Sequence, residues 1–166
     1  FHVHAPMEPM NAIAHVRAGE CEVWTGTQAP NQVLEAVAQE LALAPEKVKI
    51  HVPLLGGGFG RRLGVDYAVE AVRVSKAINA PVQVVWTRAD DMVHGFFQPA
   101  SANRLRAGLG TDGKPVAWIH TQAAAPHNSR RPPALEDPEL AADNLWGVHD
   151  NPYVLPAVKT SYEPVL

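Results

Sequence analysis

The segment best suited to chemistry is a glycine-rich run at residues 56–62, which reads Gly-Gly-Gly-Phe-Gly-Arg-Arg. We call it the glycine loop. Glycine lets the backbone take positive φ angles and approach a ligand closely, so that consecutive N–H groups can bind an anion or a metal oxo group. Arg61 and Arg62 add fixed positive charge and bidentate donors for phosphate. The competing interpretation is a tight structural turn, because Arg61 replaces the third glycine of the G-x-G-x-x-G nucleotide fingerprint.

A second candidate is Gln28, which lies in the segment Thr25-Gly26-Thr27-Gln28. We call residues 25–28 the Gln28 loop. A glutamine amide carries two donors and an acceptor, so Gln28 could bind a ligand oxygen. A helix cap or an ordinary surface position is the alternative interpretation.

Other reactive residue types carry weaker signals. The pair His2 and His4 has the spacing of two ligands on one strand face, but no nearby Cys or carboxylate completes a metal site. Residues 90–91 are both Asp, and we expect them to begin a helix rather than to bind metal. Cys21 lies between two glutamates, which raise a thiol pKa, so we assign it no nucleophilic role.

Composition excludes several classes of protein. The chain has 166 residues, of which 46% are hydrophobic and 19% charged, as in a folded globular domain rather than a disordered chain or a coiled coil. The 14 Lys and Arg residues against 17 Asp and Glu give a net charge of −3, which does not favour nucleic acid as a partner. No apolar run approaches the roughly 20 residues of a membrane span.

The single cysteine limits the disulfides and clusters that the chain can hold, and its first residue indicates how the chain relates to a longer protein. With one cysteine the chain can hold neither an internal disulfide nor an all-cysteine iron–sulfur cluster. The chain starts at Phe1 without a signal-peptide pattern, so we expect a piece of a longer polypeptide. The sequence does not decide between a cytoplasmic and a periplasmic location.

Hydrophobic periodicity predicts the elements that position the two loops. In chain order they are a hairpin within 11–25, a helix from Pro30 that ends before Pro45, a strand at 47–52, a helix over 65–78, a strand at 82–87 and a capped turn at 87–91. Short crossovers of this kind usually join neighbouring parallel strands. The Gln28 loop and the glycine loop should therefore lie at the same sheet edge, where α/β proteins bind ligands. We predict an α/β (α+β) fold with two layers, helices packed on a mixed sheet.

The carboxyl-terminal part gives fewer signals. Residues 104–109 and 115–121 flank an Asp-Gly turn and predict a hairpin. Residues 125–138 hold four prolines and predict a long loop, and residues 158–162 predict a final strand. We therefore expect a cofactor-binding α/β domain over residues 1–124 and a loop-rich extension over 125–166.

Four segments together resemble a known family. They are His-Ala-Pro-Met-Glu-Pro-Met-Asn at 4–11, Glu-Val-Trp-Thr-Gly-Thr-Gln-Ala-Pro at 22–30, the glycine loop, and Trp-Thr-Arg-Ala-Asp-Asp-Met at 86–92. In this order and spacing they resemble the molybdenum-binding large subunits of the xanthine oxidase and aldehyde oxidase family, and most closely its isoquinoline 1-oxidoreductase beta-subunit branch. The resemblance covers most of residues 4–109.

The resemblance implies a molybdenum hydroxylase that oxidises an aldehyde or an N-heteroaromatic substrate with water-derived oxygen. Its cofactor would be molybdenum bound to molybdopterin, in bacteria often the cytosine dinucleotide form. Electrons would leave through [2Fe-2S] clusters on a small partner subunit, and the remainder of the large subunit would complete the site. The fold implied is that of a molybdenum cofactor-binding domain.

The resemblance also implies roles for individual residues. Gln28 would donate to a molybdenum oxo ligand, and no residue here would ligate the metal directly. The residues expected to contact the cofactor are Gln28, Gly57, Gly58, Phe59, Gly60 and Arg61. Purine-oxidising members carry a glutamate where this chain has Leu63, which argues against purine substrates. The general-base glutamate is expected beyond Leu166, so we expect this chain alone to be inactive.

Two other functions stay open. The glycine loop and its arginines could belong to a non-catalytic α/β module that binds an anion or a phosphorylated metabolite. A purely structural or assembly domain is the third possibility.

Overall fold

The computed structural model describes residues 2–125, 147–148 and 151–165. The chain divides into two compact units, residues 3–97 and residues 98–166 together with 1–2. The expected division into domains at residues 1–124 and 125–166 stays a prediction.

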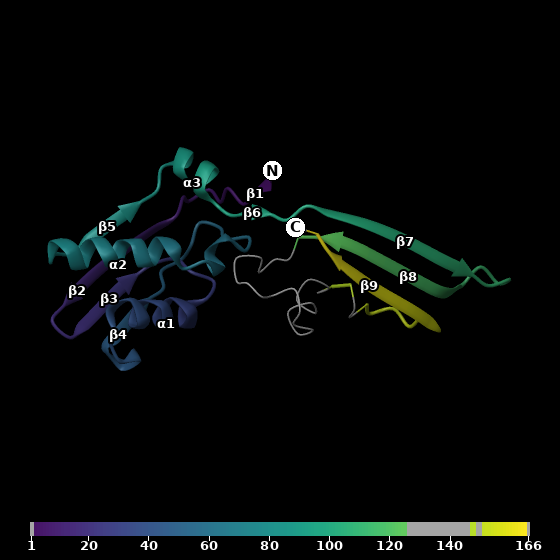
Figure 1. The fold of residues 1–166 in the computed structure, drawn as a ribbon, viewed down its shortest axis with the longest axis horizontal. Helices are drawn as coiled ribbons and strands as arrows, with labels where there is room; N and C mark the ends of the chain where they lie inside the picture. Colours follow the sequence, from purple (N-terminus) through teal and green to yellow (C-terminus); the bar gives the residue numbers. More distant parts are fainter. Residues whose placement is uncertain (1, 126–146, 149–150, 166) are drawn as a thin grey trace. The chain divides into compact units, whose positions relative to one another are not determined.

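The first unit carries the predicted alternation of strands and helices (Figure 1). Its elements are β2 (Asn11–Arg17), β3 (Glu20–Trp24), α1 (Pro30–Leu41), η1 (Pro45–Lys47), β4 (Val48–His51), η2 (Arg61–Leu63), α2 (Asp66–Ile78), β5 (Val82–Val85) and α3 (Arg88–His94). The two-residue strands β1 (His2–Val3) and β6 (Phe97–Gln98) lie at the sequence borders between the units.

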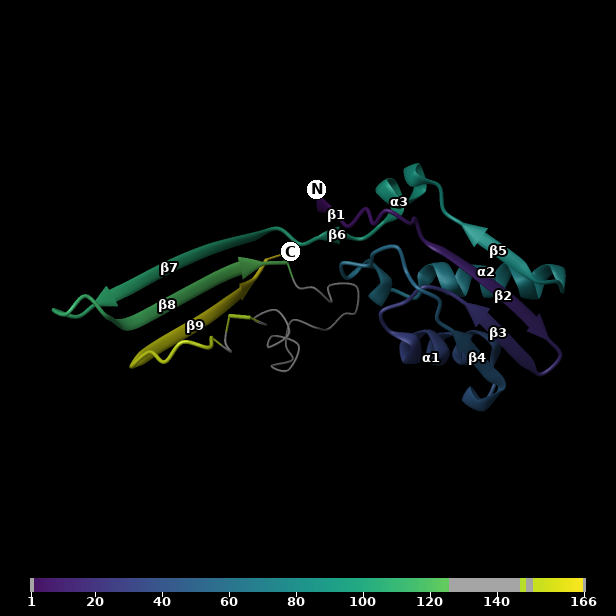
Figure 2. The ribbon, with the colours of Figure 1, turned by 180° about the vertical axis from the view of Figure 1, so that it is seen from behind.

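The sheet of this unit has the strand order β4-β3-β2-β5 (Figure 2). β2 and β3 form the expected antiparallel hairpin, and β3 pairs with β4 in parallel. The expectation that β4 and β5 are neighbours is wrong, because β5 pairs with β2 instead. The hairpin places β2 between β3 and β5, so the crossover through α2 passes over two strands.

Both long helices contribute to one core with the sheet. α1 begins with Pro30, whose fixed φ suits a first helical turn, and buries Val33 and Val37. α2 buries Ala68 and Val72, as expected, and also Tyr67, which the sequence pattern did not assign to the core. The core contains side chains from α1, α2, β2, β3 and β4. The predicted two-layer fold of helices on a mixed sheet is confirmed.

The second unit contains a three-stranded sheet in the order β7-β8-β9. Its strands are β7 (Ser101–Leu109), β8 (Pro115–Ala124) and β9 (Ala157–Pro164). β7 and β8 form the predicted antiparallel hairpin, and β9, which contains the predicted final strand, pairs with β8 in parallel. The predicted loop at 125–138 falls almost entirely outside the described residues. Among the described residues, no helix has the length and apolar character needed to cross a bilayer.

Candidate functional site

The Gln28 loop and the glycine loop meet at the carboxyl ends of β3 and β4, as the strand order predicts. The backbone N–H of Gln28 donates to the carbonyl oxygen of Arg62 at 3.0 Å. The hydroxyl of Thr27 donates to the same oxygen at 3.1 Å. Two segments more than 30 residues apart in the sequence thus form one edge of the sheet.

A second contact fixes the side chain of Gln28. The backbone N–H of Gly60 donates to Gln28 Oε1 at 3.0 Å. Because the amide oxygen is used in this way, the NH₂ group of Gln28 lies on the other side of the amide. Gln28 is exposed, and this NH₂ group has no hydrogen-bond partner among the described residues. The arrangement therefore presents a donor that is already oriented.

The glycine loop has an unusual backbone. Gly57 and Gly60 both have φ +97°, and between them Phe59 has φ +53°, in a region that bulky residues rarely adopt. The Phe59 side chain is 73% exposed, so burial in this unit does not explain its strained conformation. Strained residues of this kind concentrate at binding and catalytic sites, at a cost of order 1–3 kcal/mol each.

The same loop leaves three successive backbone donors available. The N–H groups of Gly57, Gly58 and Phe59 have no hydrogen-bond partner within the part of the chain that the structure describes. Consecutive free N–H groups in a loop with positive φ angles form a concave site for anionic or oxo oxygen atoms. This feature agrees with the ligand interpretation of the loop.

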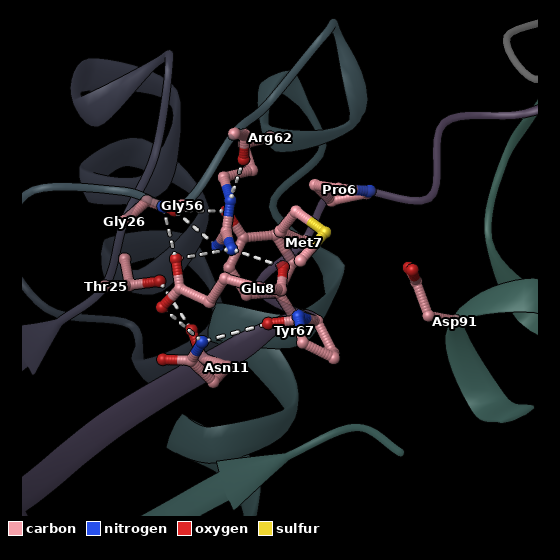
Figure 3. A network of polar contacts seen from close by, with 12 residues as sticks. Pro6, Met7, Glu8, Asn11, Thr25, Gly26, Gly56, Arg62, Tyr67 and Asp91 are labelled. Carbon is pink, nitrogen blue, oxygen red and sulfur yellow. Dashed lines mark hydrogen bonds and ion pairs between the residues drawn. The ribbon is translucent and has the colours of Figure 1, made fainter. Parts of the chain in front are cut away.

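Arg62 holds the loops together from inside the protein. Its guanidinium donates to the carbonyl oxygens of Gly57 at 2.8 Å, Gly26 at 3.1 Å and Glu8 at 2.9 Å. It also forms an ion pair with the Glu8 carboxylate at 2.9 Å, and the Arg62 side chain is fully buried. Figure 3 shows Arg62 between Glu8, Gly26 and Gly56. One side chain thus joins the glycine loop, the Gln28 loop and the segment before β2.

Glu8 is a residue of the site that reasoning from single residues missed. Its carboxylate accepts hydrogen bonds from the Gly56 N–H at 2.7 Å and from the Asn11 amide at 2.8 Å. Burial by itself raises the pKa of Glu8, but these hydrogen bonds and the charge of Arg62 lower the pKa below its usual value. The resemblance at residues 4–11 was the only signal that could have found Glu8.

Tyr67, on α2, donates to one of the carbonyl oxygens that Arg62 also binds. Its hydroxyl donates to the Gly26 carbonyl oxygen at 2.9 Å, and the side chain is fully buried. Burial raises the pKa of the Tyr67 hydroxyl, which favours the protonated donor. The helical pattern expected from the sequence did not include this residue among the inward positions.

Arg61 has a different environment, also inside the unit. Both of its terminal nitrogens donate to the carboxylate of Asp66, at 2.9 and 2.7 Å. Its guanidinium lies 4.3 Å from the ring centroid of Phe96 and 5.2 Å from that of Trp86. Contrary to the expectation from the sequence, both arginines are engaged with protein groups and neither is presented to a phosphate. A cofactor contact of Arg61 stays a prediction.

The weaker candidates do not join into a second site. Among the described residues, no group of three or more His, Cys, Asp or Glu could hold a metal ion. Residues 90–91 lie in the first turn of α3, and Asp90 forms a capping box with Thr87. Cys21 is buried, and burial raises the pKa of its thiol to about 11. His4 lies next to the glycine loop, and its Nδ1 donates to the Phe96 carbonyl oxygen at 2.8 Å. Leu63, which directly follows the glycine loop, is half exposed.

Comparison with known proteins gives consistent matches. The molybdopterin cofactor-binding domain model matches residues 2–166. The isoquinoline 1-oxidoreductase subunit beta of Brevundimonas diminuta is 43% identical over 72% of this chain, and the membrane-bound aldehyde dehydrogenase (pyrroloquinoline-quinone) of Gluconacetobacter polyoxogenes is 37% identical over 74%. The chain spans about 16% of the length of either relative.

Solved structures show the same fold. Quinoline 2-oxidoreductase from Pseudomonas putida 86 aligns with 75% of this chain and 16% of its own, at a TM-score of 0.66 and 24% identity. The carbon monoxide dehydrogenase of Oligotropha carboxidovorans aligns with 99% of this chain and 22% of its own, at a TM-score of 0.68 and 22% identity.

Proposed function

Because this chain belongs to the molybdopterin cofactor-binding domain family, we propose that it forms part of the large subunit of a molybdenum hydroxylase that oxidises an aldehyde or an N-heteroaromatic substrate. The resemblance to the xanthine oxidase family is thereby confirmed. The observation that supports this function most is the fixed amide of Gln28, whose oxygen is held by Gly60 and whose NH₂ group points away from it.

The residues at this edge fit a molybdenum–molybdopterin cofactor. An oxo group needs hydrogen-bond donors, and the Gln28 NH₂ group together with the free N–H groups of residues 57–59 are such donors. When bound, the cofactor supplies the two-electron oxidation of the substrate carbon with water-derived oxygen. The contacts that we propose come from Gln28, Gly57, Gly58, Phe59, Gly60 and Arg61. We also propose that the molybdopterin of this cofactor is in the cytosine dinucleotide form.

The residues of this chain would orient the cofactor and exclude water. Gln28 and the loop N–H groups donate hydrogen bonds at positions that are set before the cofactor arrives, so no reorganisation is needed. The exposed Phe59 ring would cover the metal side with an apolar surface. Arg62 and Glu8 keep the loops in register. The ion pair of Arg61 with Asp66 joins the glycine loop to α2.

Two features bear on the substrate. One of the two relatives is named for isoquinoline and the other for an aldehyde. Leu63 provides an apolar side chain where purine oxidisers of the family have a carboxylate. We therefore propose that hypoxanthine is a poor substrate.

The remaining parts of the reaction require other polypeptide segments. The chain has one buried cysteine, so we propose that the [2Fe-2S] clusters lie on a small partner subunit. We also propose that the general-base glutamate belongs to the remainder of the large subunit, and that the 166-residue chain alone is inactive.

The test uses the full-length protein that contains this chain. Gln28→Ala should lower turnover of an aldehyde or an N-heteroaromatic by about 10 to 1000-fold at unchanged molybdenum content, as for loss of one preorganised donor. Gln32→Ala, which changes an exposed glutamine on α1, is the matched control and should leave turnover unchanged. Unchanged turnover in Gln28→Ala with full metal content would contradict the proposal.

Metal analysis of the same preparation tests the cofactor. One molybdenum and one pterin per large subunit are expected. Since one relative is named for a quinone cofactor, a quinone without molybdenum would overturn the assignment.

A further inference from the structure

We propose that residue 58 is a glycine because of Gln28, and that Gly58 and Gly60 together are positioning residues for the Gln28 amide. The consequence for catalysis rests on the proposed function.

The space above Gly58 is filled by one side chain. A Cβ atom at position 58 would lie 2.7 Å from Gln28 Cδ and 3.1 Å from Gln28 Cγ, and even closer to Oε1. The three nearest atoms all belong to Gln28. Gly58 itself is buried although Gln28 is exposed. The Gln28 side chain therefore packs directly on the Gly58 backbone.

Backbone conformation does not explain this glycine. Gly57 and Gly60 have φ +97°, where any side chain is strained, whereas φ of Gly58 lies outside the left-handed region. An alanine at position 58 could thus keep the observed backbone angles. Its methyl group would collide first with Gln28, to which the three nearest atoms belong.

Position 56 shows a different reason for glycine in the same loop. A Cβ atom there would lie 2.6 Å from the Cβ atom of Glu8, and no atom of Gln28 is among its nearest neighbours. Gly56→Ala therefore disturbs the loop through Glu8 and provides a matched control.

Three contacts together determine how the amide is presented. The Gln28 backbone N–H is bonded to Arg62 O at 3.0 Å, Oε1 accepts from Gly60 N–H at 3.0 Å, and Gly58 allows the side chain to lie against the loop. A methyl group at position 58 would push the Gln28 amide off the loop. The amide would then lose the hydrogen bond from the Gly60 N–H. The NH₂ group would then no longer point in its fixed direction.

The experiment is a double-mutant cycle in the full-length holoenzyme, with Gly58→Ala, Gln28→Ala and the double variant. Gly58→Ala should lower turnover by about the same factor as Gln28→Ala, about 10 to 1000-fold. In the Gln28→Ala background it should have no further effect, because the colliding atoms are gone. In the Gln28→Ala background, Gly56→Ala should instead lower turnover further, because its methyl group would collide with Glu8 and not with Gln28.

Two readouts do not depend on activity. Molybdenum and pterin content should be equal in Gln28→Ala and in the double variant, and a crystal structure of Gly58→Ala should show the Gln28 amide turned away from Gly60 N–H. A further loss of turnover or cofactor in the double variant would overturn the inference, since Gly58 would then serve the cofactor or the fold. If Gly58→Ala alone fails to fold, recovery of the folded protein by adding Gln28→Ala supports the inference, and no recovery overturns it.

The cycle separates this inference from the proposed function. If Gln28→Ala has full molybdenum and full turnover, the role of Gln28 fails, while the position of the amide in the Gly58→Ala crystal structure still decides whether Gly58 positions it.

Discussion

The glycine loop and the β7–β8 hairpin are both turns rich in glycine, yet they are stabilised in different ways. The hairpin turn closes through neighbours, with Gly110 N–H bonded to Lys114 O at 2.8 Å and Lys114 N–H bonded to Asp112 at 3.1 Å. The glycine loop is held by partners 32 to 54 residues away in the sequence, from Gln28 and from Glu8.

The two turns also differ in the burial of their charged groups. The ion pair of the hairpin, between Lys114 and Asp112 at 3.6 Å, has side chains that are 81% and 58% exposed. The Arg62 side chain of the glycine loop is fully buried. A turn that serves only to reverse the chain can be specified by local residues, whereas a turn that presents donors to a ligand needs buried support from other segments.

The largest effect is expected for Arg62→Met in the 166-residue chain. The substitution leaves the Glu8 carboxylate and the carbonyl oxygens of Gly26 and Gly57 without their shared donor. The free energy of unfolding should fall by about 3 kcal/mol, because the change removes three hydrogen bonds to backbone carbonyls as well as the ion pair with the partly exposed Glu8. Urea unfolding followed by circular dichroism measures this change, and a loss below about 1 kcal/mol would show that the loops do not depend on Arg62.

A smaller and pH-dependent effect is expected for Glu8→Gln. Because the pKa of Glu8 is lowered in the folded protein, its ionised form stabilises the fold above the usual carboxyl pKa, and this contribution is lost as the pH falls through the lowered value. Glu8→Gln should therefore destabilise the chain by about 1 to 2 kcal/mol near neutral pH. As the pH falls through the lowered pKa of Glu8, the difference from the parent chain should shrink. A difference that is constant with pH would exclude the ion pair as its cause.

The hairpin should respond more weakly to Gly113→Ala. Gly113 has φ +77°, and no atom lies within 4 Å of the point that a Cβ atom would occupy there. Backbone strain of about 1 kcal/mol is therefore the whole cost of the substitution. Hydrogen exchange of the β7 and β8 amides should become faster, while exchange in β2 and β3 stays the same. Faster exchange in both units would contradict a local role for the turn.

The smallest effect is expected for Lys114→Ala. Exposed ion pairs contribute little to stability, so urea unfolding of this variant should be indistinguishable from that of the parent chain. A clear destabilisation would mean that the exposed Lys114–Asp112 ion pair contributes to stability as the Arg62–Glu8 pair does.

Much of the fold could be predicted because its signals are local. Val33 and Val37 repeat at helical spacing in α1, and the period-2 pattern of β4 needs only adjacent residues. The Asp-Gly pair at 112–113 specifies its hairpin in the same way. The position of both site loops at one sheet edge also followed from element order, since parallel neighbours such as β3 and β4 end at the same edge.

The sequence by itself determined the main elements, the two loops and the residues Gln28 and Phe59, which we propose to contact the cofactor. Only the tertiary structure decided that β2 separates β3 from β5, that both arginines are buried, and that Gly58 makes room for Gln28. The contacts of Gln28 and of Arg62 join residues about 30 to 50 positions apart. The pairing of β2 with β5 joins residues about 70 positions apart. No periodic pattern records such contacts, because periodicity reports which face of an element is buried and not which distant segment covers it.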